Sequence, residues 1–320
     1  MKDLVTIEEI REAAAGLVGI AIRTPLLEVR ALSELAGHPV YLKLENQQPP
    51  GAFKVRGAWT AIRRLSDEEK RQGVITYSSG NHGQAVAYAA DRLGIRAVVV
   101  MPETVSIKKL EGVKKWGGEV ELAGRTSEDR LKRCQEIVEE EGLKVIPPFD
   151  AADVVCGQAT VGLEIVEDLP EVAEIVAPVG GGGLAGGISR AVSLLKPDVT
   201  VTAVEPEGAP AYHRALEAGQ PVRLDSTASV ADGLLPLSIG KLPFEFMRNV
   251  ARSVLVSDES IVEATKWLFQ EQDILAETSG AATTAAVRSG RLEPSGPTVL
   301  VVSGGNIDPA TIAALKTVAA

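Results

Sequence analysis

The sequence is poor in aromatic residues and cysteines and has no long apolar run, and each shortage narrows what the chain can be. Aromatic residues make up 4% of its 320 positions. Its two cysteines, Cys134 and Cys156, form no CxxC motif and no Cys/His spacing, which is typical of a reducing compartment. No apolar run reaches the length of a membrane span. Residues 1–16 are typical of a charged amphipathic helix, not of a signal peptide. We therefore expect a cytoplasmic protein with no membrane partner.

Basic residues are also in the minority. The chain has 33 Lys and Arg against 43 Asp and Glu, a net charge of -10. It contains no basic stripe interleaved with aromatic residues, so we expect no nucleic-acid partner. Hydrophobic residues make up 45% of the chain, enough for a large core. Ala, Val, Leu and Gly dominate, a composition that suits an α/β protein with buried parallel strands.

Short β-branched runs alternate with amphipathic segments along the chain, and this alternation predicts an open, twisted, mostly parallel sheet flanked by helices. The predicted strands are Val40–Glu45, Val74–Tyr77, Ala97–Met101, Glu119–Leu122, Lys144–Ile146, Ile175–Val179, Val199–Val204, Val254–Val256 and Thr298–Val302. The predicted helices between them are Ala58–Leu65, Gln84–Leu93, Ile107–Trp116, Ser127–Glu141, Gly187–Leu195 and Ser260–Gln270.

The segment from Gly73 to Phe149 has a strand and helix pattern of its own. It contains four of the predicted strands and three of the predicted helices, and Pro147-Pro148 lies near its end. We therefore predict a two-domain α/β chain in which a small domain, residues 73–149, is inserted in a large domain of residues 1–72 and 150–320. Each domain is expected to contain its own mostly parallel sheet.

Five predicted strands end in loops of small or polar residues. Ligands of open α/β sheets bind outside the carboxyl ends of the strands, so one shared site at these loops is expected. The loops are Ser78–Gly83, Pro102–Thr104, Gly180–Gly183, Glu205–Gly208 and Ser303–Asn306.

The glycine loop, Gly180–Gly183, lies between a predicted strand and a predicted helix. Successive glycines let backbone N–H groups converge on an anion, and the helix N-terminus adds positive potential. A phosphate group is the expected ligand. The run Gly181-x-Gly183-x-x-Gly186 also fits a dinucleotide fingerprint, with Glu205 at the distance of a ribose contact. A nicotinamide-dependent dehydrogenase therefore stays open, although it leaves Lys54 and the other loops without a role.

Lys54 lies between Phe53 and Val55 with a glycine at either end of the stretch. A lysine among apolar neighbours loses hydration, its pKa falls, and its neutral amine can attack a carbonyl. A lysine whose stem lies along the surface is the competing interpretation. In the loop Ser78–Gly83, hydroxyl, amide, imidazole and free N–H groups precede a helix and suit a carboxylate. Simple helix capping by Ser79 or Asn81 is the competing interpretation there.

Four motifs occur in order along the chain: Gly51–Gly57, Ser78–Gln84, Pro178–Leu184 and Ser303–Asn306. With these residues the chain resembles the threonine/serine dehydratase and serine racemase family of fold type II pyridoxal-phosphate enzymes. The resemblance extends from about Arg23 to Asn306. It implies pyridoxal 5'-phosphate as the cofactor, a small amino acid as the substrate and a homodimer as the assembly.

The resemblance also implies roles for individual residues. Lys54 and Ser79 would be catalytic, with Lys54 binding the cofactor aldehyde and removing the Cα proton, and Ser79 acting from the opposite face of Cα. Ser303 would face the pyridine nitrogen, and such a neutral hydroxyl favours β-elimination over transamination. The other implied cofactor contacts are Phe53, Asn81 (to the phenolic oxygen), Gly180, Gly181, Gly182, Gly183, Leu184 and Glu277. The implied substrate contacts are Ser78, Ser79, Asn81, His82 and Arg130.

The predicted reaction is the α,β-elimination of a β-hydroxy amino acid, L-threonine or L-serine, to a 2-oxo acid and ammonia. Two related activities stay open: a serine racemase, and a dehydratase of another 3-hydroxy amino acid such as 3-hydroxyaspartate or phenylserine. Outside this class, a catalytically silent pyridoxal-phosphate-binding protein stays open beside the dehydrogenase.

Three stretches depart from the family pattern. Pro50–Lys54 lacks the two hydroxyls of the usual Thr-Gly-Ser-Phe-Lys, which affects the substrate side of the pocket. Glu277–Gly280 replaces the usual Glu-Pro-Thr/Ala-Gly. The family's loop for Mg²⁺ or Ca²⁺ is matched at Glu205 and at the Ala209 carbonyl, but Ala211 stands where an acid is usual. A cation site there would keep Glu205 alone among the family's acids.

Overall fold

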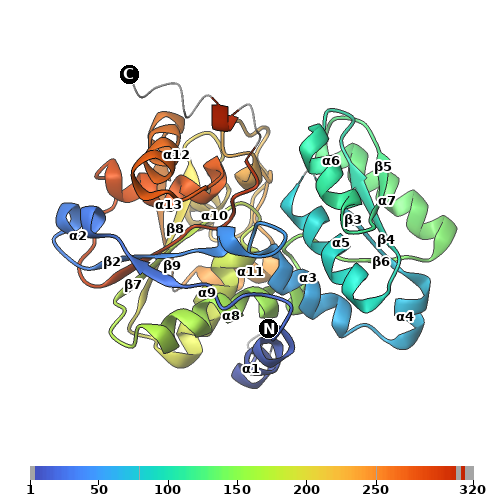
Figure 1. The fold of residues 1–320 in the computed structure, drawn as a ribbon, viewed down its shortest axis with the longest axis horizontal. Coiled ribbons are helices and arrows are strands. Elements are labelled where there is room, and N and C mark those ends of the chain that lie inside the picture. The colour runs from blue at the N-terminus through green and yellow to red at the C-terminus, as the bar shows by residue number, and fades with distance from the viewer. Residues whose placement is uncertain (1–3, 79, 250, 308–310, 314–320) are drawn as a thin grey trace.

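The computed structural model describes residues 4–78, 80–249, 251–307 and 311–313, which form two mostly parallel sheets flanked by helices (Figure 1). This confirms the predicted α/β class. The larger sheet has six strands, all in parallel pairs except β1, which runs antiparallel to β2. Its strands in spatial order are β1 (Leu26–Glu28), β2 (Val40–Lys43), β10 (Thr298–Val301), β7 (Glu174–Pro178), β8 (Thr200–Pro206) and β9 (Ala251–Val256).

The smaller sheet is all parallel and lies in the cyan-to-green half of Figure 1. Its strands in spatial order are β5 (Glu119–Leu122), β4 (Ala97–Met101), β3 (Val74–Tyr77) and β6 (Lys144–Val145). The four strands of this sheet, β3 to β6, follow one another in the sequence between β2 and β7. The six-stranded sheet is therefore formed by chain segments that precede and follow them. The domain boundaries themselves, at 72/73 and 149/150, stay a prediction.

The helices include six that the sequence patterns did not predict: α2, α4, α8, α10, α11 and α13. The α-helices are α1 (Ile7–Gly16), α2 (Arg30–Ala36), α3 (Lys54–Arg63), α4 (Asp67–Gln72), α5 (Asn81–Leu93), α6 (Ile107–Lys114), α7 (Ser127–Glu141), α8 (Ala152–Asp168), α9 (Gly183–Leu195), α10 (Ala211–Ala218), α11 (Lys241–Met247), α12 (Asp258–Gln272) and α13 (Thr278–Arg288), with 3₁₀ turns η1 (Glu45–Gln47) and η2 (Asp232–Leu234). Within the described ranges, none of these helices is both long and apolar enough to cross a membrane.

The larger sheet differs from the prediction in two features, a strand that was missed and a residue that was misplaced. β1 escaped prediction because three residues show too little periodicity to identify a strand. Glu205 was placed in the loop after a strand, but β8 continues through Pro206, so Glu205 is a strand residue. It pairs with Leu255 of β9.

The strand order places three loops next to one another. β10 lies between β2 and β7, and the three strands are parallel. Their carboxyl ends therefore meet at one edge of the sheet, the edge where ligands bind in open α/β folds. The loop that leads from β2 to Lys54, the Ser303 loop after β10 and the glycine loop after β7 all begin there.

Candidate active site

The loop before Lys54 is fastened to the loop after β10. Gly51 has φ +79, and a Cβ there would lie 2.3 Å from Oδ1 of Asn306, so the position requires glycine. Ala52 forms an isolated antiparallel bridge with Gly304. The N–H of Phe53 donates to the carbonyl of Ser303 at 3.1 Å. Lys54 then begins α3, and its place beside Ser303 follows from these contacts.

The amine of Lys54 lies in a setting that weakens its charge. Its Nζ donates to the carbonyl oxygen of Pro148 at 2.7 Å and lies 5.1 Å from the centroid of the Phe53 ring. The side chain is half-buried, and burial lowers the pKa of Lys54 from 10.5 to about 8. A substantial share of the amine is therefore neutral near physiological pH, as nucleophilic and base chemistry require.

The glycine loop turns directly into the start of α9. Gly182 has φ +86, and a Cβ there would come within 2.8 Å of Ile239, so this turn too requires glycine. Gly183 begins α9 and Leu184 follows it. The first N–H groups of a helix have no partner inside the helix and attract an anion. The loop is buried yet presents these donors, which fits a phosphate.

Pro148 and Phe149 join the lysine to the glycine loop. The carbonyl of Pro148 holds Lys54, and a Cβ on Gly181 would lie 2.1 Å from the ring of Phe149. Gly183 also borders Phe149. Lys54 and the anion-binding start of α9 thus lie on either side of Pro148 and Phe149. This arrangement fits pyridoxal phosphate, whose aldehyde would meet Lys54 and whose phosphate would meet the glycine loop.

Asn81 is the centre of a hydrogen-bonded chain across the site. Its Nδ2 donates to Oε1 of Glu277 at 2.5 Å, and its Oδ1 accepts from Nδ2 of Asn306 at 2.8 Å. Asn306 donates the same amide to the carbonyl of Pro50 at 2.8 Å. The backbone N–H of Glu277 donates to Gly304 at 3.0 Å. Burial, with the nearby charge of Asp232, raises the pKa of Glu277 to about 7.

The loop after β3 leads into α5. Oγ of Ser78 accepts from the N–H of Gly80 at 3.1 Å. His82 is buried, and its Nε2 lies 3.0 Å from the carbonyl of Ile146, so Nε2 carries the proton. Its Nδ1 has no partner among the described residues. Burial and then the charge of Lys54 lower the pKa of His82 to about 3, so its ring stays neutral. Ser79 lies outside the described residues.

Two further predicted site residues, Arg130 and Glu205, are both buried. Arg130 lies in the first turn of α7, where burial lowers its pKa. Glu205 is fully buried, and its carboxylate oxygens accept the N–H groups of Tyr212 at 2.7 Å and His213 at 2.9 Å. These contacts fasten the start of α10, a structural role that competes with both a metal and a ribose contact.

The predicted cation site gains no support around Glu205. The carbonyl of Ala209, the other predicted ligand, accepts the N–H of Ala211 at 3.1 Å in the turn before α10. In the ranges that the structure describes, no three His, Cys, Asp or Glu side chains are grouped to hold a metal ion. The nicotinamide interpretation also loses its acidic ribose partner, because both Glu205 oxygens are already engaged by α10.

Sequence reasoning gave no site role to Pro148, Phe149 and Asn306. Pro147-Pro148 was interpreted only as the end of a domain, since a backbone carbonyl that accepts a bond leaves no mark in the sequence. Asn306 was part of a recognised motif, and its amide partner Asn81 lies 225 positions away. The glycine at position 51 was the available signal, because it makes room for the Asn306 side chain.

The comparisons with known proteins agree with this geometry. A family model described as pyridoxal-phosphate dependent enzyme matches residues 19–304. The L-threonine ammonia-lyase of Thermotoga maritima is 39% identical over 307 residues, which cover 95% of this chain and 76% of that protein. Maize serine racemase has a structure with a TM-score of 0.93 at 35% identity, covering 97% of this chain and 96% of that one. The serine racemase of Dictyostelium discoideum gives 0.88 at 36% identity, covering 95% and 99%. The chain therefore belongs to the family of pyridoxal-phosphate-dependent enzymes.

Proposed function

We propose that this protein is an ammonia-lyase that converts L-threonine or L-serine to a 2-oxo acid and ammonia by α,β-elimination. The observation that carries the proposal is the fastening of the Lys54 loop to the Ser303 loop, through Phe53 and the Ser303 carbonyl. This bond supports the proposal because it joins the backbone next to Lys54 to the backbone of Ser303 at the strand ends. The threonine ammonia-lyase of Thermotoga maritima, as a relative over 95% of this chain, supports the same reaction.

The chain's own residues divide the work of holding the cofactor. The N–H groups of Gly180–Leu184 would bind the phosphate, Lys54 would bind the aldehyde carbon, and Asn81 would donate to the phenolic oxygen. Ser303 would face the pyridine nitrogen, and Phe53 and Glu277 would lie beside the ring. When bound, pyridoxal phosphate withdraws electron density from the substrate's Cα–H bond.

The loop after β3 binds the substrate carboxylate in this proposal. The donors are Ser78, Ser79, Asn81 and the N–H groups at the start of α5, where the helix dipole favours an anion. The ring of His82 is committed to Ile146, so His82 contributes through its backbone N–H. Arg130 adds positive charge on the same side.

Lys54 moves the proton in the proposed reaction. Its neutral amine takes the proton from Cα, and the resulting ammonium is held by the Pro148 carbonyl that already accepts from Nζ. The β-hydroxyl then leaves as water with the proton that Lys54 took from Cα, and hydrolysis of the released enamine consumes a water and gives the 2-oxo acid and ammonia. Ser303 donates a hydrogen bond without imposing a full positive charge on the pyridine ring, which favours expulsion of the β-substituent over transamination.

A serine racemase is the second candidate, favoured by the TM-score of 0.93 to the maize enzyme. In that case Ser79 would protonate Cα from the face opposite Lys54. A dehydratase for a bulkier or acidic 3-hydroxy amino acid is a variant of the first candidate, and Ala52 marks where its pocket would differ from its relatives.

The test is cofactor binding followed by a product assay. The purified protein is expected to turn yellow with pyridoxal 5'-phosphate, and Lys54→Ala is expected to lose that absorbance band and about 10²–10⁴-fold of the rate. Lys132→Ala, on the exposed face of α7, is the matched control. Release of 2-oxo acid from serine, threonine and their 3-hydroxy analogues identifies the substrate, and chiral analysis separates a racemase. A protein that stays colourless, or that binds a nicotinamide cofactor instead, would contradict the proposal.

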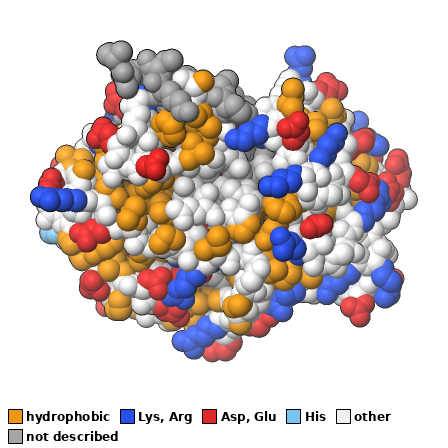
Figure 2. Space-filling model, viewed as in Figure 1, with side chains coloured by type: hydrophobic (Ala, Val, Ile, Leu, Met, Phe, Trp, Pro, Cys, Tyr) orange, Lys and Arg blue, Asp and Glu red, His pale blue; other side chains and the backbone are white. Residues whose placement is uncertain are grey.

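We also propose that the protein acts as a cytoplasmic homodimer with the small domain, residues 73–149, inserted in the large one. Both cysteines are free and buried, in keeping with a reducing compartment. Apolar side chains are exposed near α1 and β1, with Val18 82% exposed, Ile22 47% and Leu27 42%. Figure 2 shows hydrophobic side chains gathered on the part of the surface that carries β1 and β2. Light scattering coupled to size-exclusion chromatography would show a mass of two chains, and a single-chain mass would contradict the dimer.

A further inference from the structure

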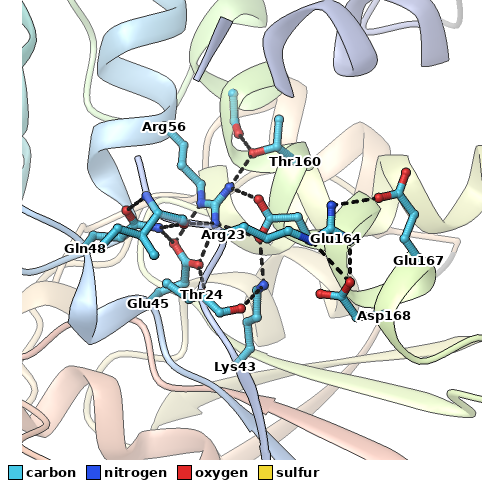
Figure 3. Close-up of polar contacts among 12 residues, drawn as sticks. Arg23, Thr24, Lys43, Glu45, Gln48, Arg56, Thr160, Glu164, Glu167 and Asp168 are labelled. Atoms are coloured by element: carbon cyan, nitrogen blue, oxygen red, sulfur yellow. Dashed lines mark hydrogen bonds and ion pairs between the residues drawn. The ribbon is translucent and has the colours of Figure 1, made fainter. Parts of the chain in front are cut away.

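Arg56 lies two residues after Lys54 and is among the most buried side chains of the molecule, with 1% of its surface exposed. Its guanidinium lies between two carboxylates (Figure 3). Nε and one terminal nitrogen donate to the two oxygens of Glu45, both at 2.8 Å. The terminal nitrogens also donate to the two oxygens of Glu164, at 2.7 and 2.9 Å. Thr160 and the carbonyl of Ile22 take further bonds, at 3.0 and 3.2 Å.

The cluster around Arg56 is balanced in charge. Lys43 donates to Glu164 and to the carbonyl of Thr24, each at 2.7 Å, so two cations face two carboxylates. Burial works to lower the pKa of Arg56, but the carboxylates raise it above its ordinary value. Burial likewise works to raise the pKa of Glu45, and Arg56 reverses this and lowers it. Arg56 and Glu45 therefore stay ionised.

Arg56 lies where α3 and α8 approach each other closely. A Cβ on Gly157 would lie 2.3 Å from the carbonyl oxygen of Arg56, and one on Gly57 would lie 2.4 Å from Gln158. Only glycines allow this approach. Since Glu164 and Thr160 belong to α8, the guanidinium fixes the rotation and the height of α3 against that helix.

Each partner of Arg56 belongs to a segment of the chain that also contains or adjoins a site contact. Glu45 begins the turn after β2, and the next residue, Asn46, donates its N–H to the carbonyl of Val302 beside Ser303. Glu164 belongs to α8, and the segment just before α8 contains Pro148, which holds Nζ of Lys54. The residue before α3, Phe53, has no side-chain oxygen that could cap the helix. Arg56 is thus a polar anchor in the first turn of α3, the turn that begins at Lys54.

We propose that Arg56 is a positioning residue: by clamping the first turn of α3 between Glu45 and Glu164, it holds the Lys54 amine at the Pro148 carbonyl and beside the Ser303 loop. The inference rests on the proposed function, since it assumes that Lys54 binds pyridoxal phosphate. Buried ion pairs add little stability compared with apolar side chains of the same shape, but their geometry is strict. A bidentate clamp on both sides of one guanidinium suits placement better than stability.

The test compares Arg56→Lys with Lys43→Met in the full-length protein. Arg56→Lys keeps the positive charge but loses the paired hydrogen bonds to Glu45 and Glu164, so the first turn of α3 is no longer held on both sides. Lys43→Met also breaks a buried pair of the same cluster, but Lys43 lies on β2, and its amine bonds to Glu164 and to the Thr24 carbonyl rather than to α3. Three quantities are measured: the melting temperature, the Kd for pyridoxal 5'-phosphate, and the fraction of Lys54 fixed to it by borohydride, read by peptide mass.

At a matched loss of melting temperature, Arg56→Lys is expected to weaken pyridoxal-phosphate binding and to lower kcat by about 10²-fold with little change in KM. Lys43→Met is expected to keep the wild-type Kd and the wild-type labelling of Lys54. Equal behaviour of the two variants overturns the inference and leaves the proposed function standing. A wild-type protein with no label on Lys54 overturns both. If Arg56→Lys does not fold, Glu45→Gln, which weakens the same paired hydrogen bonds, takes its place with a smaller effect in the same direction.

Discussion

Three buried ionisable residues keep the fixed charge of the proposed site low. Burial favours their neutral forms, with the pKa of Lys54 lowered to about 8, that of Glu277 raised to about 7 and that of His82 lowered to about 3. Few fixed charges then oppose the placement of a charged ligand. The glycine-loop N–H groups and the start of α5 provide directed dipoles instead, which need no reorganisation when charge develops.

We expect Lys54→Met to stabilise the protein without cofactor at neutral pH. The folded chain releases the Lys54 proton above about pH 8, whereas the unfolded chain keeps it up to about 10.5. Below pH 8 the folded protein bears the cost of a buried ammonium. Between these values the unfolded chain binds more protons, so the wild-type stability rises with pH. The gain from Lys54→Met is roughly 2 kcal/mol at pH 7, less than the full shift because the bond to Pro148 is lost as well.

The measurement is urea unfolding of both apoproteins at pH 7 and at pH 9.5. The stability gap is expected to narrow as the pH rises. Lys132→Met, at an exposed position of α7, serves as the control with no gap at either pH. A gap that is absent at pH 7, or that widens toward pH 9.5, would show that burial does not lower the Lys54 pKa.

Single-residue contacts also mark where sequence reasoning ends. Lys54 and Ser303 were predicted as site residues through motifs, because each supplies a side chain with recognisable chemistry. Pro148 contributes only a carbonyl, and it lies 94 positions from the lysine that it holds. Arg56 was visible in the motif, but its partner Glu164 lies 108 positions away on an unpredicted helix. Such pairings depend on the tertiary fold.

At the scale of elements, the short helix α11 forms the back of the glycine loop. The carboxylate of Asp150 accepts the N–H groups of Leu242 at 3.0 Å and Lys241 at 3.1 Å, which caps the helix. The preceding residue, Gly240, donates its N–H to the carbonyl of Gly181 at 3.1 Å. Pro243 borders Gly182. Asp150 therefore supports the turn that is proposed to bind the phosphate.

Removal of this cap is expected to weaken cofactor binding. Asp150→Ala should lower the free energy of unfolding by about 1 kcal/mol, the usual cost of a lost N-cap. Because α11 backs the glycine loop, it should also raise the Kd for pyridoxal 5'-phosphate several-fold. Ser66→Ala is the matched control, since Ser66 caps the exposed helix α4 away from the site. Equal Kd values for the two variants would show that α11 does not support the phosphate loop.

The elements that were predicted with the right bounds carry a clear local pattern. β3 and β4 are short runs rich in β-branched residues, β5 alternates charged and apolar residues, and α7 is amphipathic. The missed helices α8 and α13 are buried over most of their length. A helix that is buried on most sides lacks the contrast between an apolar and a polar face on which a periodic signal depends. Their small residues, such as Gly157, serve close packing that only the fold reveals.

At the scale of the whole molecule, α3 belongs to the cores on both sides of it. One continuous apolar cluster contains Ala58, Trp59 and Ile62 of α3 together with residues of the four-stranded half, including Val86 of α5. Ile146, next to β6, and Val154 of α8 belong to the same cluster. The helix that begins with Lys54 therefore packs against elements of both halves. The predicted domain boundary after residue 72 separates two stretches of sequence whose side chains belong to one apolar cluster.

This shared core predicts that the two halves of the apoprotein unfold together. The chain has three tryptophans, one in each relevant place: Trp59 in the shared cluster, Trp116 beside β4 and α5, and Trp267 in the core of the larger sheet. Three variants that each keep one tryptophan and carry Phe at the other two can be unfolded in urea without cofactor. Because loss of the four-stranded half would expose the apolar face of α3, all three fluorescence transitions should coincide with the far-ultraviolet circular dichroism of the same variant.

If the Trp116 signal changes at a lower urea concentration than the circular dichroism, with the Trp267 signal at a higher one, then the halves are independent and the packing of α3 against α5 is too weak to couple them. A Trp59 signal that follows the later transition would assign α3 to the larger half alone.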